Sequence, residues 1–422
     1  MLERFKNEVK KYTEKLEIKI IPRIAGLFSK EDLNERSNDV TGSKEEGEQQ
    51  HIWVKRMEQF RTALNSIHKG FPGMKVQEPN RVKVALIDDG VDLSALDIYD
   101  GIVKATGQSY CYPDNRGESP WHRSSNGHGT IMANMIVRIN PWVSLYVMKL
   151  QDGPSIDGGR YIFAESAAKA IRGAIQRNVD IISMSWTIKQ KIATNSSNVS
   201  SRRTLSPSER YPKSTLETNG LKLLEEAIEA AVEAKILMFC SASDDIQDGG
   251  MDCLPYQKAP HHIFRIGAAL SQGQRDPHSE DKGNMDYFFP GNQVAEAWNP
   301  RSAQTVKYHN GSSVSTALSA GFASLIIYCV IIMRTYYESK PGVNDTNYIR
   351  FRDFAEALKD RDKMKMAFDS IEYKGWDDRK YLPVWGYFGT ATEEINKAKS
   401  GEEKVEQLGR LAMQLCGKLN MS

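Results

Sequence analysis

The chain has 422 residues and a mass of 47.6 kDa, and 40% of its residues are hydrophobic. This length and composition exclude disorder throughout the chain and predict one large domain with additions, or two domains. Lys and Arg number 56 against 54 Asp and Glu, which leaves a formal net charge of +2. Such a balanced charge excludes a protein that binds nucleic acid or anionic lipid over its whole surface. We therefore expect neither nucleic acid nor a membrane as a partner.

Cysteine usage and the N-terminus both indicate the compartment. The cysteines are few, odd in number and far apart: Cys111, Cys240, Cys253, Cys329 and Cys416. This spacing is not typical of a small secreted scaffold held by disulfides and favours a reducing compartment. The first residues interleave charged and apolar side chains and lack the continuous apolar run of a secretory signal. We therefore expect a cytoplasmic location.

Residues 1–78 have the composition of a helical N-terminal region with a charged linker. Apolar residues at spacings of three and four between positions 2 and 16 predict an amphipathic helix that Pro22 would stop. The segment 29–50 is polar and charged, which is typical of a linker. A second helical pattern covers 51–70. The helices of this region and those expected after residue 338 are a candidate binding site for a protein partner.

Residues 79–338 alternate short apolar runs with helical patterns. The predicted strands cover 82–87, 144–150, 180–186, 236–242 and 263–269, and two of the predicted helices cover 164–178 and 221–235. Strands that alternate with helices predict an α/β domain with a mostly parallel sheet and helices on both of its faces. In such a sheet, functional residues are expected at the carboxyl ends of the strands.

Three further segments affect the domain layout. The polar, Ser-rich insertion 189–220 is interpreted as a mobile surface loop, with a docking segment as the alternative. The uncharged stretch 314–333 is close to the length of a membrane span, but its first half is small and hydroxylated, which favours a buried helix. Residues 339–422 carry charged helical patterns around the aromatic segment 381–389 and are predicted to form a helical C-terminal extension.

Three residues at the expected edge of the sheet could carry chemistry. Asp88 ends the first predicted strand, His128 lies in the sequence NGHGT, and Ser313 lies in NGSSVSTALSAG before a small-residue helix. Taken singly, each residue is more often structural, as a turn or cap, a core histidine or a helix N-cap. Together, in the order Asp, His, Ser within one α/β region, they match one of the known sequence orders of the catalytic triad.

From about residue 81 to residue 335 the chain resembles the subtilisin-like serine peptidases, the subtilases or S8 peptidase family. The segments VALIDDGVD, NGHGTIMANMI and NGSSVSTALSAG match the family's aspartate, histidine and serine motifs. The resemblance implies a subtilisin-like fold and a serine endopeptidase that works through an acyl-enzyme intermediate. It is closest to intracellular subtilase modules, which in fungal proteins often accompany helical signalling or scaffold regions.

The resemblance also implies a role for each residue of the triad. Ser313 would be the nucleophile, and His128 would take its proton and later give it to the leaving amine. Asp88 would fix the tautomer of His128 and support its charged form. A serine at a helix N-terminus also brings the developing oxyanion close to backbone amides.

Residue 244 departs from the family pattern. Asp244 stands where the family places an amide side chain that donates a hydrogen bond to the oxyanion. An ionised carboxylate accepts but cannot donate, so the oxyanion hole would lose a donor and gain a repulsive charge. Burial or the neighbouring Asp245 could instead keep Asp244 protonated. Slow or selective catalysis is then expected.

The resemblance further implies a peptide groove lined by the segments at 185–187 and 241–244. The substrate-binding residues expected from it are Ser185, Trp186, Thr187, Ser241 and Ser243. Where the family has glycine, Thr187 and Ser243 add side-chain atoms, so we expect a narrower pocket for the residue before the scissile bond.

The sequence predicts no cofactor. Calcium is common in the family, but no acidic cluster with coordination spacing can be assigned, so no metal ligand is predicted. Two functions remain open: an active endopeptidase on peptides or proteins, and a catalytically weak or silent subtilase fold that acts as a peptide-binding or regulatory module. The complete triad motifs favour the enzyme, whereas Asp244 and the narrowed groove favour the silent module.

Overall fold

The computed structural model describes most of the chain from residue 51 onward. The described residues are 51–71, 73, 76, 80–99, 101–112, 119–154, 160–189, 213–242, 253–276, 285–296, 306–339, 345–371 and 380–419. They belong to one compact unit that begins at Gln49. The predicted helix at 2–16 and the predicted linker at 29–50 lie outside them.

The centre of this unit is a parallel sheet of seven strands in the order β11-β10-β8-β6-β1-β3-β2, in which every neighbouring pair is parallel. The strands are β1 (Lys83–Asp88), β2 (Lys104–Ser109), β3 (Ser144–Lys149), β6 (Ile181–Met184), β8 (Leu237–Ser241), β10 (Ile263–Ala269) and β11 (Tyr287–Pro290). Strands β6, β8, β10 and β11 are buried throughout, because their apolar runs face a hydrophobic core on both sides. The predicted parallel sheet is confirmed.

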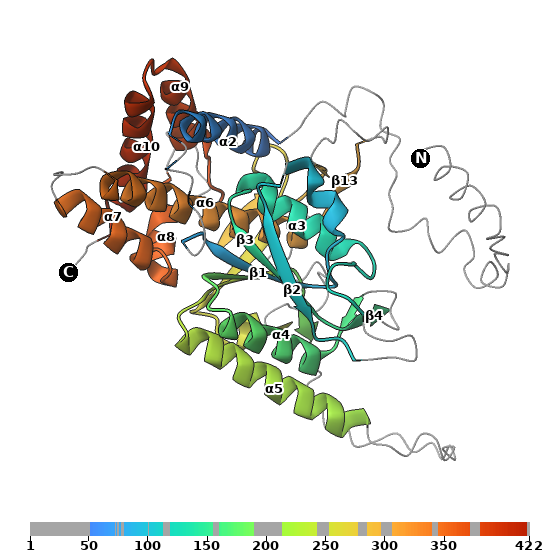
Figure 1. Ribbon diagram of the computed structural model, residues 1–422. Coiled ribbons are helices and arrows are strands. Elements are labelled where there is room, and N and C mark those ends of the chain that lie inside the picture. Colours follow the sequence, from blue (N-terminus) through green and yellow to red (C-terminus); the bar gives the residue numbers. More distant parts are fainter. Residues whose placement is uncertain are drawn as a thin grey trace, which may run out of the picture. The chain divides into compact units, whose positions relative to one another are not determined.

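Helices cover both faces of the sheet (Figure 1). On one face lie α4 (Ala164–Gln176) and α5 (Lys213–Glu233), and on the other lie α3 (His128–Ile139), α6 (Ser312–Glu338) and α2 (Ile52–Gly70). Alternate residues of β1 show the two cores, because Val84 and Leu86 pack in one while Ala85 and Ile87 pack in the other. The prediction of helices on both faces is thereby confirmed.

Helix α6 is the uncharged segment that the sequence left between a buried helix and a membrane span. By length and composition it passes as a span, and it is the one helix of the described residues that does so. Its most apolar window of 18 residues is nevertheless 100% buried inside the protein. The prediction of a buried core helix is confirmed.

The terminal helices share the core of the sheet. The chain after α6 forms α7 (Asp345–Ala357), α8 (Arg361–Asp369), a π-helical turn (Trp385–Gly389), α9 (Thr390–Lys397) and α10 (Gly401–Cys416). Apolar residues of these helices, of α2 and of α6 belong to one hydrophobic cluster, and the indole of Trp53 on α2 donates to the carbonyl of Leu382 at 3.1 Å. The sequence limits at residues 78 and 338 are therefore not boundaries between compact units.

Three details differ from the sequence-based expectations. Strand β2 carries no apolar run because its residues are alternately exposed and half-buried at the sheet edge. Helix α5 begins at Lys213, so the end of the predicted insertion 189–220 is helical, while residues 190–212 lie outside the described residues. Within the predicted C-terminal extension, the charged residues 350–368 fall in two helices, α7 and α8, because Asp360 caps α8 by accepting from the amides of Asp362 and Lys363.

Short elements lie around the sheet. They are the 3₁₀ helices Leu93–Tyr99 and Tyr256–Lys258 and the two-stranded antiparallel pairs of β4 (Asp152–Pro154) with β5 (Arg160–Ile162), β7 (Ile188–Lys189) with β9 (Cys253–Leu254), and β12 (Val294–Ala295) with β13 (Tyr308–His309). The β4–β5 pair follows β3 directly, which places it near the carboxyl ends of β3 and β1, where the candidate residues lie.

Candidate active site

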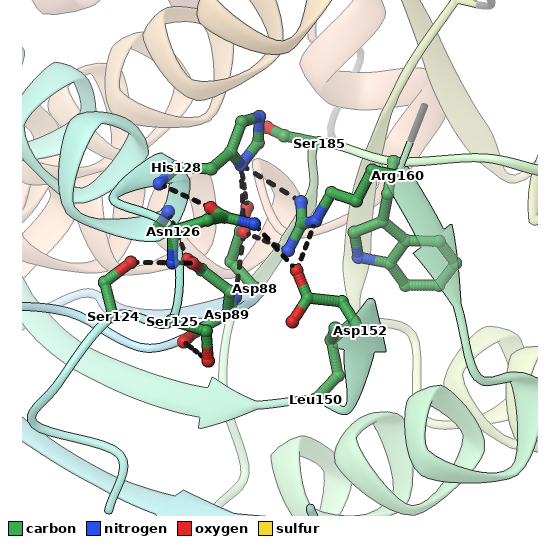
Figure 2. A network of polar contacts seen from close by, with 12 residues as sticks. Asp88, Asp89, Ser124, Ser125, Asn126, His128, Leu150, Asp152, Arg160 and Ser185 are labelled. Carbon is green, nitrogen blue, oxygen red and sulfur yellow. Dashed lines mark hydrogen bonds and ion pairs between the residues drawn. The ribbon is translucent and has the colours of Figure 1, made fainter. Parts of the chain in front are cut away.

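Asp88 and His128 contact each other at the carboxyl end of β1. Asp88 is the last residue of β1 and is fully buried. The Nδ1 atom of His128 lies 2.9 Å from Oδ1 and 3.0 Å from Oδ2 of Asp88 (Figure 2). A carboxylate in this position can orient the imidazole and stabilise its protonated form. The structure thus brings together two of the three residues expected to form a triad.

The neighbouring carboxylate of Asp89 fixes the loop that carries His128. It accepts hydrogen bonds from the amide of Asn126 at 2.7 Å, the hydroxyl of Ser124 at 2.7 Å and the amide of Gly129 at 2.6 Å. His128 is the first residue of α3, whose first amides have no acceptor within the helix. The Asp89 side chain satisfies one of these amides and so fixes the start of α3 against the end of β1.

Glycine is required on both sides of His128 for different reasons. Gly127 precedes α3 with φ at +90°, a left-handed conformation that glycine adopts without strain. At Gly129 the close approach decides, because a Cβ atom would overlap the carbonyl oxygen of Gly90 and lie 2.7 Å from Oδ1 of Asp89. The backbone of α3 therefore approaches the turn after β1 closely at Gly129.

A guanidinium also occupies this site. Arg160, the first residue of β5, donates through Nη2 to Oδ1 of Asp88 at 2.8 Å and through Nε to Oδ2 of Asp152 at 2.7 Å. Its Nη1 atom lies 3.1 Å from Nδ1 of His128. In Figure 2 the guanidinium lies beside the contact of His128 with Asp88, and the carboxylate of Asp152 lies on its other side.

These charges determine the protonation of the carboxyl groups. Burial alone would raise the pKa of Asp88, but the charges of Arg160 and His128 together with its hydrogen bonds outweigh burial and hold that pKa well below its usual value. Asp89 behaves oppositely: burial and then the negative charge of Asp88 raise its pKa, against the opposing effect of its three donors. Asp88 is therefore the more firmly ionised member of the pair.

Ser313 is the second residue of α6 and is half-buried. Its hydroxyl donates to the carbonyl of Ser185 at 3.1 Å, and the hydroxyl of Ser185 donates to the carbonyl of Ser313 at 3.1 Å. Ser185 directly follows β6, which pairs with β1, so this reciprocal pair ties the start of α6 to the edge that carries Asp88. Figure 2 shows the second ring nitrogen of His128 on the side of Ser185, away from Asp88. Among the described residues, His128 and Ser313 share no hydrogen bond.

The other residues expected to line a groove have different surroundings. Trp186 is 4% exposed, packs in the core beneath α4 and α5, and donates from its indole to the carbonyl of Ile87 at 2.8 Å. Ser241, at the end of β8, is buried, whereas Thr187 is half-buried. Ser243 and Asp244 lie outside the described residues. The substrate-groove assignment and the oxyanion assignment remain predictions.

Sequence reasoning missed Arg160, Asp152 and Asp89. The second aspartate of VALIDDG was visible as a signal, because a buried strand that ends in two carboxylates has to satisfy both of them. Arg160 gave no local signal, since its partner Asp88 lies 72 residues earlier in the chain. Among the described residues no group of three or more His, Cys, Asp or Glu side chains is placed to hold a metal ion.

The family model described as "Subtilase family" matches residues 80–330, which is more than half of the chain. The chain belongs to the subtilase family. Subtilases are serine-type peptidases, and membership identifies this protein as a hydrolase of that type. Comparison with curated protein sequences found no match.

Several solved structures share parts of this fold at low sequence identity. A lanthipeptide protease is 18% identical with a TM-score of 0.49, covering 80% of this chain and 96% of its own. A cold-adapted subtilisin-like serine proteinase is 17% identical with a TM-score of 0.41, and the match covers 63% of this chain and 85% of that protein. The prenylagaramide maturation protease PagA is 15% identical with a TM-score of 0.44, covering 81% and 98%.

Proposed function

We propose that this subtilase is a serine endopeptidase in which Asp88, His128 and Ser313 form the catalytic triad. The observation that supports this most strongly is the contact of the buried Asp88 carboxylate with Nδ1 of His128. When Nδ1 donates to Asp88, the other ring nitrogen, Nε2, has a free lone pair. In Figure 2 this nitrogen lies on the side of Ser185, which is hydrogen-bonded to Ser313. Contacts of catalytic residues often tighten only when substrate binds, so the present bond of Ser313 to Ser185 is compatible with this role.

In the proposed mechanism, the hydroxyl oxygen of Ser313 attacks the peptide carbonyl while its proton passes to Nε2 of His128. The tetrahedral intermediate then collapses as His128 gives this proton to the leaving amine, which leaves an acyl group on Ser313. Water repeats the two steps and releases the second product. Throughout, Asp88 stays ionised and stabilises the charged imidazole, in keeping with its lowered pKa.

The oxyanion would be stabilised by backbone amides at the start of α6, which have no acceptor within the helix. Residue 244 is the second proposed contributor, on sequence grounds alone. If its carboxyl group is ionised, Asp244→Asn restores a donor and raises turnover by about one to three orders of magnitude. If the group is protonated, the parent loses activity as pH rises through its pKa and the Asn variant does not. Identical pH profiles for an active parent and the variant would contradict this role.

Labelling with a fluorophosphonate tests the nucleophile directly. The reagent should modify the parent chain at Ser313, as shown by peptide mass mapping, and should not modify Ser313→Ala. Ser312→Ala is the matched control, because its hydroxyl donates to the carbonyl of Ala242 at 2.8 Å and has no proposed catalytic role. Unchanged labelling of Ser313→Ala, or modification of a different serine, would overturn the assignment.

A catalytically weak or silent module that binds peptides is the alternative, and it predicts no labelling of the folded parent.

We also propose a cytoplasmic location and a peptide or protein substrate. None of the five cysteines, all of which are among the described residues, forms a disulfide, in keeping with a reducing compartment. Protease protection in fractionated cells tests the location, and release of the protein with secreted proteins would contradict it.

A further inference from the structure

We propose that a cavity at the amino-terminal edge of the central sheet binds a phosphate dianion, held chiefly by Lys83 and Arg334. The cavity has a volume of 190 Å³ and is lined by residues from the start of β1, the turn before β6, the end of α6 and the end of α7. The proposal goes beyond the peptidase function and does not depend on it.

The cavity is separate from the candidate active site. Lys83 begins β1 and Asp88 ends it, so five steps of about 3.3 Å place the two residues about 16 Å apart. Arg334 lies near the end of α6, about 31 Å along the helix from Ser313 at a rise of about 1.5 Å per residue. An anion in the cavity therefore does not occupy the place of a substrate at the triad.

Cationic side chains outnumber carboxylates around the cavity. The charged residues among its described lining are Arg81, Lys83, Arg334 and Lys359 against Asp180 and Glu356. Four positive and two negative side chains leave an excess of two positive charges. A phosphate monoester carries about −1.5 to −2 charges at pH 7, so one such group balances the excess.

Both carboxylates already bind the same lysine. Nζ of Lys359 lies 3.2 Å from Oδ1 of Asp180 and 3.1 Å from Oε2 of Glu356. The other oxygen of Asp180, Oδ2, accepts from the backbone amide of Lys83 at 2.8 Å. Burial opposes the charge of Lys359, but Asp180 and then Glu356 outweigh burial and raise the pKa of its ammonium group. Lys359 is therefore charged and already paired.

Lys83 and Arg334 supply the positive charge that is not paired. Both residues are half-buried, and within the described part of the chain neither side chain forms an ion pair or a hydrogen bond. The buried residues Ile331 and Ala355 line the same cavity and give it an apolar wall. A charge beside an apolar wall is incompletely hydrated, which favours the binding of a counter-ion.

The donors around the cavity suit a phosphate group. The guanidinium of Arg334 offers a planar fork of N–H donors that matches two phosphate oxygens, and the ammonium of Lys83 binds phosphate as a point charge. The side-chain amides of Asn80 and Asn178 line the cavity as well and can donate. Pockets for drug-sized ligands begin at about 300 Å³, so this smaller cavity favours a small anion.

Calorimetric titration of the full chain with inorganic phosphate tests the site in the parent, with chloride used to keep the ionic strength constant. We expect saturable binding with a Kd of about 1 mM or lower. At about 10 mM phosphate, such binding should raise the folding equilibrium constant about tenfold in urea denaturation. Phosphate also stabilises proteins through its exclusion from their surface, an effect that does not saturate. Absence of saturable binding below about 10 mM, or equally tight binding of acetate, would overturn the proposal.

Arg334→Gln and Lys83→Gln should each weaken phosphate binding about tenfold or more, because each removes one charged hydrogen bond. Arg172→Gln is the matched control: it also removes one positive charge, from a side chain on α4 that is 47% exposed and lies 3.6 Å from Glu226, outside the cavity. The control should bind phosphate as the parent does.

Unchanged affinity in both folded cavity variants, or an equal loss in the control, would overturn the proposal. If one cavity variant does not fold, the other variant and the titration of the parent still decide. Ser313→Ala should bind phosphate as tightly as the parent, so the result is independent of whether the chain cleaves peptides.

A phosphoserine peptide distinguishes two sources of the phosphate group. A free small anion is the source that the cavity volume favours, and the peptide should then bind no more tightly than inorganic phosphate. A peptide affinity about tenfold or more higher would assign the same site to a phosphorylated side chain of a partner. Binding of the peptide that persists unchanged in Arg334→Gln and Lys83→Gln would contradict the proposal for either source.

Discussion

Gly129→Ala should disturb the attachment of the histidine helix to the end of β1. The added Cβ atom would overlap the carbonyl oxygen of Gly90, would lie 2.7 Å from Oδ1 of Asp89 and would lie 3.1 Å from the Cβ atom of Asp88. Real Cβ atoms do not approach backbone this closely, so α3 or the turn after β1 must shift. Because His128 directly precedes Gly129, the shift moves the imidazole relative to its carboxylate.

The expected cost follows from these contacts. Overpacking of a buried site destabilises by about 1–3 kcal/mol, and the better helix propensity of alanine returns at most about 1 kcal/mol. A displacement of the base by about 1 Å costs about 100-fold in rate. We therefore expect a loss of about 1–2 kcal/mol in the free energy of unfolding and a 10- to 100-fold loss in kcat/KM.

Urea denaturation and cleavage of a peptide substrate measure the two effects. Gly70→Ala is the matched control, because Gly70 ends α2 with nothing within 4 Å of its added Cβ atom. It should leave kcat/KM unchanged and should not lower the free energy of unfolding. If Gly129→Ala keeps the stability and the kcat/KM of the parent, the close packing of the G-H-G-T turn on β1 does not position the base, and the reasoning fails.

Three further changes test the contacts around the site. Asp89→Asn should lower the free energy of unfolding by about 1–3 kcal/mol in urea denaturation, because in either orientation its amide group places a donor against an amide that Asp89 now satisfies; equal stability would contradict this. Trp186→Phe should lower the free energy of unfolding by about 2 kcal/mol, because the indole hydrogen bond to the carbonyl of Ile87 is lost, and an unchanged urea midpoint would contradict this. The KM of the same variant tests the prediction that Trp186 lines the substrate groove. The pKa of Asp88 is lowered on folding, so its ionised carboxylate contributes fully to the free energy of unfolding above about pH 4, and this contribution is lost only as pH falls through the lower folded pKa. In urea titrations between pH 5 and 2, Asp88→Asn should therefore lack this loss of stability. Parallel plots of unfolding free energy against pH for the two proteins would contradict this.

The parts of the fold that sequence could predict are those with a continuous local pattern. Strands such as Ile263–Ala269 are apolar throughout because both faces are buried, and α2 ends at Gly70 as its stripe and glycine indicate. Strand β2 was missed because an edge strand with one exposed face needs no apolar run. The split between α7 and α8 depends on a single cap at Asp360, which the helical pattern around it concealed.

The candidate site divides in the same way. Asp88 and His128 are brought together as their motifs predict, because each motif encodes its own local geometry: a strand end for one, and a glycine-flanked helix start for the other. Arg160 could not be predicted, because its effect depends on a long-range approach of the β4–β5 pair to β1. A charged residue in a polar loop is ordinary, and only its three contacts distinguish it.

The most direct test of the triad is a double-mutant comparison of Ser313→Ala and His128→Ala in the cleavage of one peptide substrate. When catalytic residues act as a unit, removing one of them abolishes the contribution of the others. Each single variant should therefore lose about 10⁶-fold in kcat, the scale known for subtilisin, and the double variant should lose no more. Urea denaturation of all three variants should show that they remain folded. Losses that multiply in the double variant, or a single variant that retains the kcat of the parent, would contradict a catalytic unit formed by these residues.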